Sequence, residues 1–347
     1  GDGEDAARAQ QAGWIQYLQA QGLETTGQAD PAAGSLLTEL LVPERHHRVL
    51  EICCSTGADR DRACRTLSAM CGDEQVVPGV LVCNDGSLPA LSELISQARR
   101  LPSCAPLLVT CCEPSLFPTL QCAAPAAESA GDEGQAELAD RQVKYKFDQV
   151  FCVPSCCEGV RSGLMRHAAL VATLRRGLEV LKPGGKLVYS TDTLDPLQSE
   201  AVVAAAVRAL RSLPEWSFGL ELEHVSLSGV ASASGLTSWI VPHPDFGLLG
   251  CDSTYAEFDD VPKALRPVIK STAFPPSVTR DDAALCDELK KCARVLDRDG
   301  AATFVALLRK RTASEVAALA AELDAATVDE GSEEGGLVPF SVANPPQ

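Results

Sequence analysis

The residues best suited to chemistry in this sequence stand where apolar segments end. Asp192 follows an apolar segment that begins at Leu187, and Glu51 and Asp85 lie at the ends of two further apolar segments. Apolar segments of this length, bounded by turn residues, are typical of buried strands. The carboxyl ends of parallel strands form the ligand-binding edge of an open α/β sheet. These carboxylates therefore mark a candidate site at one edge of a sheet.

The segments around these carboxylates alternate in the way that an α/β protein requires. Strands are predicted at 48–53, 79–84, 106–110, 146–153 and 186–190, and helices at 59–70, 87–101, 167–181 and 199–213. Strands that alternate with helices at this spacing indicate a mostly parallel, doubly wound sheet. The Lys-Pro-Gly-Gly sequence at 182–185 is expected to form the turn before the fifth strand.

The last third of the chain has a different pattern. Residues 218–226 alternate between apolar and polar types and 303–308 are strand-like, which predicts an antiparallel pair, and we expect 286–295 to be helical. Thr312 and Glu315 have the spacing of a capping box that opens a helix. The predicted units are an N-terminal helical segment over 1–42, with helices at 14–21 and 35–41, a domain over 43–310 with an acidic insertion at 123–141, and a helix with a flexible acidic tail over 311–347.

Composition narrows the function classes. The net charge of −17 and pI near 4.7 argue against binding along nucleic acid through charge alone, although a local basic face is compatible with them. Arg99, Arg100, Lys144, Lys146 and Arg166 are the candidates for such a face, the alternative being scattered solvated charges. No apolar segment approaches the length of about 18 residues that a membrane span needs, so no membrane contact is expected.

The number and spacing of the cysteines indicate a reducing, intracellular compartment rather than a metal site. The chain has 15 cysteines but no Cys-x-x-Cys pair, so we expect reduced thiols, an intracellular location and no bound metal. Several thiols nevertheless fall near predicted strand ends, and a thiolate site there is the alternative. The first residue is Gly rather than Met, which is compatible with a removed presequence. If a presequence was removed, we expect a mitochondrial location, and otherwise the nucleus or the cytoplasm.

The order of several motifs carries a family resemblance. These motifs are His46-His47-Arg48-Val49-Leu50, Pro154-Ser155-Cys156, Lys182-Pro183-Gly184-Gly185, Tyr189-Ser190-Thr191-Asp192, Leu194-Asp195-Pro196 and Leu265-Arg266-Pro267. In this order the chain resembles the RNA cytosine-5 methyltransferases of the Sun/Nop, RsmB-like group, and within it the eukaryotic tRNA cytosine-5 methyltransferase branch. The resemblance covers roughly residues 13–310. It implies a Rossmann-like S-adenosylmethionine-dependent methyltransferase fold, with a mostly parallel seven-stranded sheet and an antiparallel last strand.

The resemblance also implies that the catalytic residues are degenerate. The family attacks cytosine C6 with a cysteine directly after Thr, and here that position is Asp192. The family's second cysteine corresponds to Ser155, and the aspartate that contacts the base corresponds to Cys152. A carboxylate is a much poorer nucleophile than a thiolate and repels RNA phosphates. No catalytic residue is therefore expected, although Cys156 is a displaced nucleophile if Ser155 is an insertion.

The cofactor-binding positions match the family's pattern more closely than the catalytic positions do. Glu51, Gly57, Asp85 and Glu113 stand at the positions that hold S-adenosylmethionine in the family, with Cys112 as the alternative to Glu113 if a one-residue gap is placed there. Glu51 and Glu113 are each one methylene longer than the family's Asp. Asp85 is placed where a ribose diol could be gripped. Because the longer side chains would crowd the pocket, S-adenosylmethionine is a candidate cofactor that we expect to be absent.

These observations predict a pseudoenzyme. The first hypothesis is an inactive methyltransferase-like scaffold or assembly factor in an RNA–protein complex, with rRNA or tRNA and further proteins as partners, in ribosome biogenesis or RNA processing. The alternatives are an active cytosine-5 methyltransferase that uses Cys156, and a protein-binding module without RNA contact.

Overall fold

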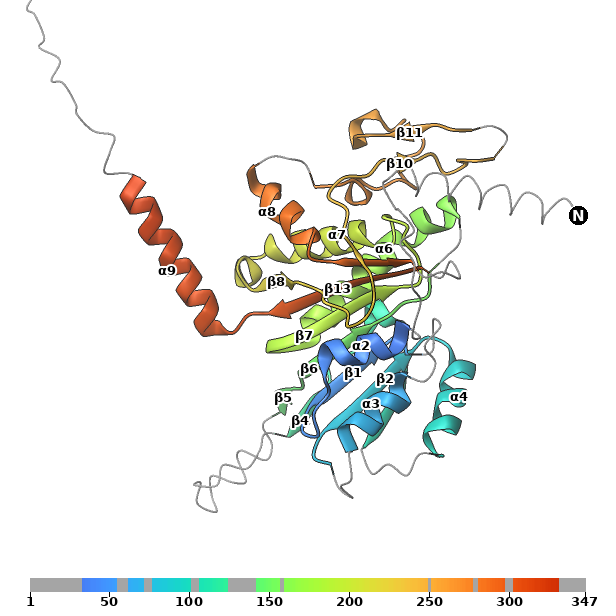
Figure 1. The fold of residues 1–347 in the computed structure, drawn as a ribbon, viewed down its shortest axis with the longest axis vertical. Helices are drawn as coiled ribbons and strands as arrows, with labels where there is room; N and C mark the ends of the chain where they lie inside the picture. The colour runs from blue at the N-terminus through green and yellow to red at the C-terminus, as the bar shows by residue number, and fades with distance from the viewer. Residues whose placement is uncertain are drawn as a thin grey trace, which may run out of the picture.

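A twisted mixed sheet forms the centre of the molecule (Figure 1). The computed structural model describes residues 33–54, 62–71, 77–100, 106–123, 142–156, 159–248, 251–276, 280–296 and 302–330. Within them the sheet has nine strands in the order β3-β2-β1-β6-β7-β13-β12-β9, with β8 paired to β13. The five strands from β3 to β7 in this order are parallel: β3 (Leu107–Cys111), β2 (Val80–Asp85), β1 (Arg48–Ile52), β6 (Phe147–Cys152) and β7 (Leu181–Thr191).

The strand β13 (Ala302–Lys310) is antiparallel to β7. On its other side, its first half pairs with β12 (Ala293–Leu296) and its second half with β8 (Leu220–Glu223), and β9 (Ala233–Ser234) extends the edge beyond β12. The predicted α/β class, with a mostly parallel sheet and an antiparallel last strand, is confirmed. The count is nine rather than seven because β8 and β12 share one position and β9 is added.

Helices cover both faces of the sheet, as a doubly wound topology requires. Successive strand residues face opposite layers: Val49 and Val188 lie in one hydrophobic core, and Leu50 and Leu187 lie in the other. The helices of the first layer are α2 (Ala33–Leu41), α3 (Arg62–Cys71) and α4 (Leu88–Ala98), and those of the second are α6 (Val160–Val180), α7 (Glu200–Arg211) and α8 (Arg280–Leu289).

Short elements complete the described chain. The helix α9 (Ala313–Glu330) follows β13 and extends away from the domain in Figure 1. Two small antiparallel pairs are β4 (Gln121–Ala123) with β5 (Gln142–Lys144), and β10 (Val241–Pro242) with β11 (Thr254–Tyr255). The short 3-10 helices are η1 (Pro114–Leu116), η2 (Pro214–Trp216), η3 (Phe258–Asp260) and η4 (Ser271–Ala273). No described helix is long and apolar enough to cross a membrane.

One predicted helix is wrong in part. The segment 286–295 was expected to be helical, but α8 ends at Leu289 and the chain re-enters the sheet as β12 at Ala293. The pairing of Ala293 with Val305 in β13 overrides the local preference. An apolar run this short fits a helix or a buried strand equally well until its partner is known.

Three boundaries also differ from the predictions. The helix expected over 167–181 begins at Val160, because Val160, Leu164 and His167 continue the buried face of α6. The expected turn at 182–185 is an irregularity within β7, where the register against β6 shifts. The helix α9 runs to Glu330, six residues past Asp324, where an acidic tail was expected to begin.

The predicted capping box is confirmed. The backbone N–H of Thr312 donates to Glu315 Oε2 at 2.7 Å, and the N–H of Glu315 donates to Thr312 Oγ1 at 3.3 Å. The helix expected at 14–21, residues 124–141 of the insertion and the tail from 331 lie outside the described residues.

A buried ion pair joins β12 to α7. Arg294 pairs with Glu200 and also donates to the carbonyl oxygen of Leu194, while Glu200 accepts the backbone N–H of Leu236 at 2.9 Å. Both charged side chains are almost completely excluded from solvent, at 2% and 0% exposure. Removal of one partner would leave an uncompensated charge in the core.

We therefore predict that Arg294→Met lowers the free energy of unfolding by about 3–5 kcal/mol. The double variant Glu200→Gln, Arg294→Met should recover most of that loss, because no buried charge is left unpaired. Urea unfolding followed by circular dichroism measures both. A single variant as stable as the original chain would contradict this role.

Candidate active-site edge

The carboxyl ends of β1, β2, β3, β6 and β7 lie together, and we call this region the carboxyl edge. Burial raises the pKa of the Cys53 thiol well above its ordinary value, and Cys152 and Asp85 raise it further. Tyr189 in β7 has a raised pKa from burial, with Cys156 and Cys152 adding to it. Residues from separate strands thus interact at the carboxyl edge, as the positions of these residues at predicted strand ends indicate.

The turn after β1 has an unusual backbone. Cys53 has a φ of +64°, a conformation that is uncommon for a residue with a side chain. The following N–H, of Cys54, donates to the carbonyl oxygen of Asn84 at 3.1 Å. The turn therefore leaves β1 sharply and is held against the end of β2.

Asp192 lies beside Cys156. Burial raises the pKa of the Cys156 thiol well above its ordinary value, the carboxylate of Asp192 raises it further by charge and hydrogen bonding, and the Asp192 backbone N–H acts in the opposite sense. The Asp192 side chain is exposed, whereas Cys156 is half-buried. A thiol held protonated in this way is a weak nucleophile at neutral pH.

Buried hydrogen bonds fix the loop that follows Asp192. Asp195 accepts the N–H of Leu197 at 2.9 Å and the Gln198 amide at 3.0 Å, and burial raises its pKa to about 6. The Tyr189 hydroxyl donates to the carbonyl oxygen of Gln198 at 2.6 Å. These contacts hold the loop in one shape against the end of β7.

His167 anchors the same loop from α6. Its Nδ1 lies 2.8 Å from the carbonyl oxygen of Leu197, and its Nε2 lies 3.1 Å from Thr272 Oγ1. Burial lowers the pKa of His167, so the ring is neutral near pH 7. A neutral ring has one donor and one acceptor nitrogen, which suits a carbonyl on one side and a hydroxyl on the other.

The other two degenerate positions lie at the end of β6. Cys152 is fully buried, and burial raises the pKa of its thiol to about 12. Ser155 is half-buried and directly precedes Cys156. No carboxylate therefore stands at the Cys152 position to contact a base, and the thiol there has the environment of a core residue.

Glu51 faces a helix rather than the carboxyl edge. It accepts the hydroxyl hydrogen of Thr66 at 3.1 Å, and its other oxygen lies 3.4 Å from Nε of Arg62. Both charged side chains are 0% exposed. The Arg62 guanidinium also lies 5.8 Å from the centroid of the Phe151 ring. Glu51 therefore positions α3 against β1.

The described residues fit S-adenosylmethionine in part. Asp85 accepts the N–H of Ser87 at 2.8 Å and is near enough to Cys53 to raise its pKa, as is the exposed Glu113 after β3. Two carboxylates thus flank the turn after β1, where the hydroxyl groups of a ribose would be bound. The carboxylate of Glu51 is already paired with Arg62, and Gly57 lies outside the described residues.

Metal-ligand types come together elsewhere. Among the described residues, one group of three side chains has a spacing that could hold a metal ion: Glu44, His46 and His47, whose ligand atoms lie within 4.8 Å of one another. It lies before β1, at the opposite end of the sheet from Asp192, and His47 Nδ1 already accepts the N–H of Glu44 at 3.0 Å. The strand-end thiols do not form such a group in the described part of the chain.

Comparison with known proteins identifies relatives by sequence. The chain is 29% identical over 280 residues to tRNA (cytosine(34)-C(5))-methyltransferase of Drosophila melanogaster, covering 76% of this chain and 34% of that protein. It is also 29% identical over 212 residues to the multisite-specific tRNA:(cytosine-C(5))-methyltransferase of Saccharomyces cerevisiae, covering 56% and 28%. Its relatives are tRNA cytosine-C5-methyltransferases. The resemblance expected from the motifs is confirmed.

The extent of the match is limited. The chain spans about a third of the length of these relatives. No family model matches it. Among solved structures, a methyltransferase homolog protein from Pyrococcus horikoshii is 18% identical with a TM-score of 0.45, over 81% of this chain and 67% of that one.

Several residues that shape this edge were missed from the sequence. The sequence predicts no role at the edge for His167, Tyr189 or Arg294, and it predicts Arg62 only as part of a helix. Arg294 and His167 act through partners far along the chain, Glu200 and Leu197. One signal was present for Arg62 and Arg294, because a charged residue on an apolar face requires a buried counter-charge.

The contact between Asp192 and Cys156 yields a test of thiol reactivity. In Asp192→Asn the negative charge is removed, so the pKa of Cys156 should fall and its alkylation by iodoacetamide at pH 8 should speed up at least threefold. Peptide mapping by mass spectrometry follows Cys156 among the other cysteines. Asp287→Asn, which changes a 75% exposed carboxylate on α8, should leave the rate unchanged. Equal rates in all three proteins would disprove the contact.

Proposed function

We propose that this chain is an RNA-binding, methyltransferase-like protein that does not methylate cytosine and serves as a scaffold or assembly factor in an RNA–protein complex. RNA is the proposed partner because the relatives are named for tRNA. Other proteins of that complex, from ribosome biogenesis or RNA processing, are the further partners of the proposal.

The observation that supports inactivity is the environment of Cys156 and Asp192. Attack on C6 of a cytosine requires a thiolate, and the fraction of thiolate falls tenfold for each unit by which the thiol pKa rises above the ambient pH. Burial and the Asp192 carboxylate both raise the pKa of Cys156. Asp192 itself is a poor nucleophile toward a pyrimidine, so neither residue supplies the first step.

A second requirement is also unmet. Addition to C6 is helped by an acid or hydrogen-bond donor at the base, and the position expected to supply a carboxylate is Cys152. This thiol is 0% exposed, and its pKa is raised to about 12. Loss of the nucleophile and of the base contact at adjoining strand ends supports a loss of the whole reaction.

Binding of S-adenosylmethionine is compatible with this proposal but not required by it. When bound, the cofactor would supply the methyl group. Asp85 is the residue that we assign to its ribose hydroxyls, with Glu113 just after the neighbouring strand β3. A scaffold needs no methyl donor, so binding of the cofactor beside Asp85 would not decide between the hypotheses.

A second candidate is an active cytosine-5 methyltransferase that uses Cys156. One observation favours it: Cys156 lies at the carboxyl edge beside Asp192, the position where the family's nucleophile is expected. In this case Asp192 would accept the thiol proton as sulfur attacks C6. The two functions differ in whether a covalent RNA adduct forms.

The decisive experiment uses the full chain with a tRNA transcript that contains 5-fluorocytidine, together with S-adenosylmethionine. The fluorine prevents release of the enzyme, so an active protein becomes covalently attached to the RNA. We expect no adduct that survives denaturation and no tritium transfer to unmodified tRNA, but we expect ultraviolet crosslinking to the same transcript.

The matched control is Cys156→Ser, which should crosslink to RNA as the original chain does. An adduct that forms with the original chain and is lost in Cys156→Ser would overturn the proposal in favour of the active enzyme. Failure of both proteins to crosslink would instead favour a protein-binding module without RNA contact.

A further inference from the structure

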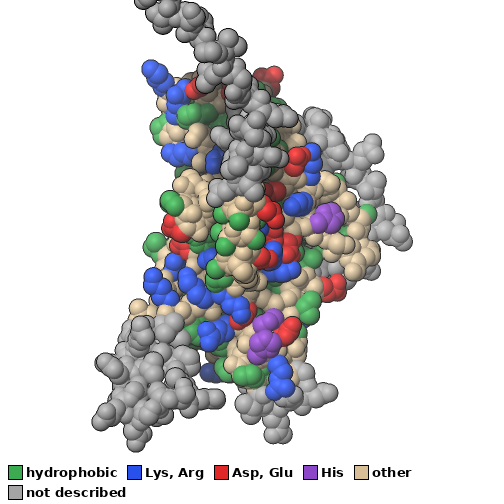
Figure 2. Space-filling model, turned by 90° about the vertical axis from the view of Figure 1, so that its left-hand side faces the viewer, with side chains coloured by type: hydrophobic (Ala, Val, Ile, Leu, Met, Phe, Trp, Pro, Cys, Tyr) green, Lys and Arg blue, Asp and Glu red, His purple; other side chains and the backbone are tan. Residues whose placement is uncertain are grey.

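Basic side chains gather at the end of the sheet opposite to Asp192. Figure 2 faces this side, where β7 begins, and Lys and Arg side chains form a group on its surface. The group lies on β5, α6, β7, β13 and the chain before β6, and we call it the cationic rim: Lys144, Lys146, Arg175, Arg176, Lys182 and Lys310.

Two lysines of the cationic rim sit at the carboxyl end of α6. Lys146 Nζ donates to the carbonyl oxygen of Glu179, and Lys310 Nζ donates to that of Leu181 at 3.2 Å. Lys310 Nζ also lies 3.9 Å from the centroid of the Trp216 ring. A helix carboxyl end favours cations, so these contacts explain why the lysines are tolerated there.

The cations of the rim are close enough to repel one another. Burial, together with a smaller contribution from Lys146, lowers the pKa of Lys310 to about 8. Burial, Arg176 and Lys144 lower the pKa of Lys146 in turn. An ammonium group whose neighbours are cations gains free energy when an anion binds beside it.

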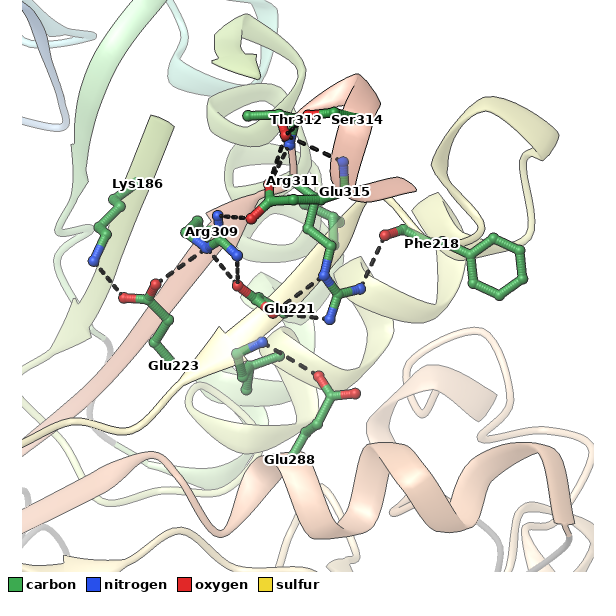
Figure 3. A network of polar contacts seen from close by, with 12 residues as sticks. Lys186, Phe218, Glu221, Glu223, Glu288, Arg309, Arg311, Thr312, Ser314 and Glu315 are labelled. Carbon is green, nitrogen blue, oxygen red and sulfur yellow. Dashed lines mark hydrogen bonds and ion pairs between the residues drawn. The ribbon is translucent and has the colours of Figure 1, made fainter. Parts of the chain in front are cut away.

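Few acidic side chains offset this charge. Glu179 is shared by Arg175, at 3.7 Å, and Arg176, at 3.1 Å, and Asp148 pairs with Lys182. The neighbouring network in Figure 3 differs, because its cations Lys186, Arg309 and Arg311 are matched by the acids Glu221, Glu223 and Glu315. The excess of positive charge is therefore local to the rim, in a chain whose net charge is −17.

We propose that the cationic rim binds the phosphodiester backbone of RNA, at a surface separate from the carboxyl edge. The proposal rests on the proposed function only for the choice of RNA as the polyanion. A strongly acidic chain repels RNA over most of its surface, so a local positive surface decides where the RNA approaches. Backbone contacts of this kind position RNA without reading its sequence.

The test is fluorescence anisotropy with a fluorescein-labelled, single-stranded RNA and the full chain, over a range of salt concentrations. Lys144→Ala, Arg175→Ala removes two rim cations, of which Lys144 is exposed and Arg175 has a side chain that is 40% exposed. Each lost phosphate contact should reduce the slope of log K against log salt by about 0.7. The double variant should therefore lose about 1.4 in slope and bind roughly 25-fold more weakly at about 0.1 M salt.

The matched control is Lys263→Ala, Lys290→Ala, which removes the same charge from exposed positions outside the rim. It should bind RNA within twofold of the original chain. Thermal unfolding of all three proteins should coincide, since the altered side chains are on the surface.

The outcomes separate this inference from the proposed function. If the original chain binds RNA and the rim variant binds it equally well, with the same slope of log K against log salt, the cationic rim is not the RNA-binding surface. The proposed function is unaffected by that result. If the original chain binds no RNA at low salt, both fail. If polyglutamate, but not RNA, binds in a rim-dependent way, the surface is a site for an acidic protein segment and the proposal is overturned.

Discussion

The buried polar contacts of the loop after β7 are the constraint on which the carboxyl edge depends. A loop that enters the core must satisfy its carbonyl and N–H groups internally, because no water is available to it. Here Tyr189 and His167 bind successive carbonyl oxygens of the loop, and Asp195 accepts two of its donors. The backbone that carries Asp192 is thus fixed before any ligand arrives. This arrangement is what a catalytic nucleophile would need, yet the residue at that position is a carboxylate.

The reactivity of the thiols at the carboxyl edge is set by their burial as much as by the presence of cysteine. The thiols of Cys53, Cys152 and Cys156 all have pKa values raised by burial, so each remains protonated at neutral pH. A reactive cysteine normally has a cation or a helix amino end nearby to stabilise the thiolate. Cys156 has the carboxylate of Asp192 instead. The number of cysteines at the strand ends is therefore a poor guide to reactivity, because the same thiols behave as small apolar side chains.

The sequence allowed the fold to be predicted more fully than the site. Strands such as β1 and β2 could be found because both of their faces are buried, which makes them continuous apolar runs. The division of residues 286–295 between α8 and β12 could not, because it depends on pairing with β13. At the site, the position of Asp192 at a strand end followed from the same apolar pattern. Its contact with Cys156, and the pairing of Glu51 with Arg62 rather than with the edge, depend on side-chain directions that one sequence does not specify.

The two ends of the sheet differ in charge, and this difference bears on how RNA would be held. The carboxyl edge presents the exposed carboxylates of Glu113 and Asp192, which would repel phosphate, whereas the positive charge of the cationic rim would attract it. An enzyme that modifies a base must bring that base out of its stack and into the catalytic pocket, at a cost of a few kcal/mol. RNA bound at the rim would be held by its backbone at the far end of the sheet and would not incur that cost. A protein that held RNA in this way could use the methyltransferase fold as a rigid support, whatever residues stand at its carboxyl edge.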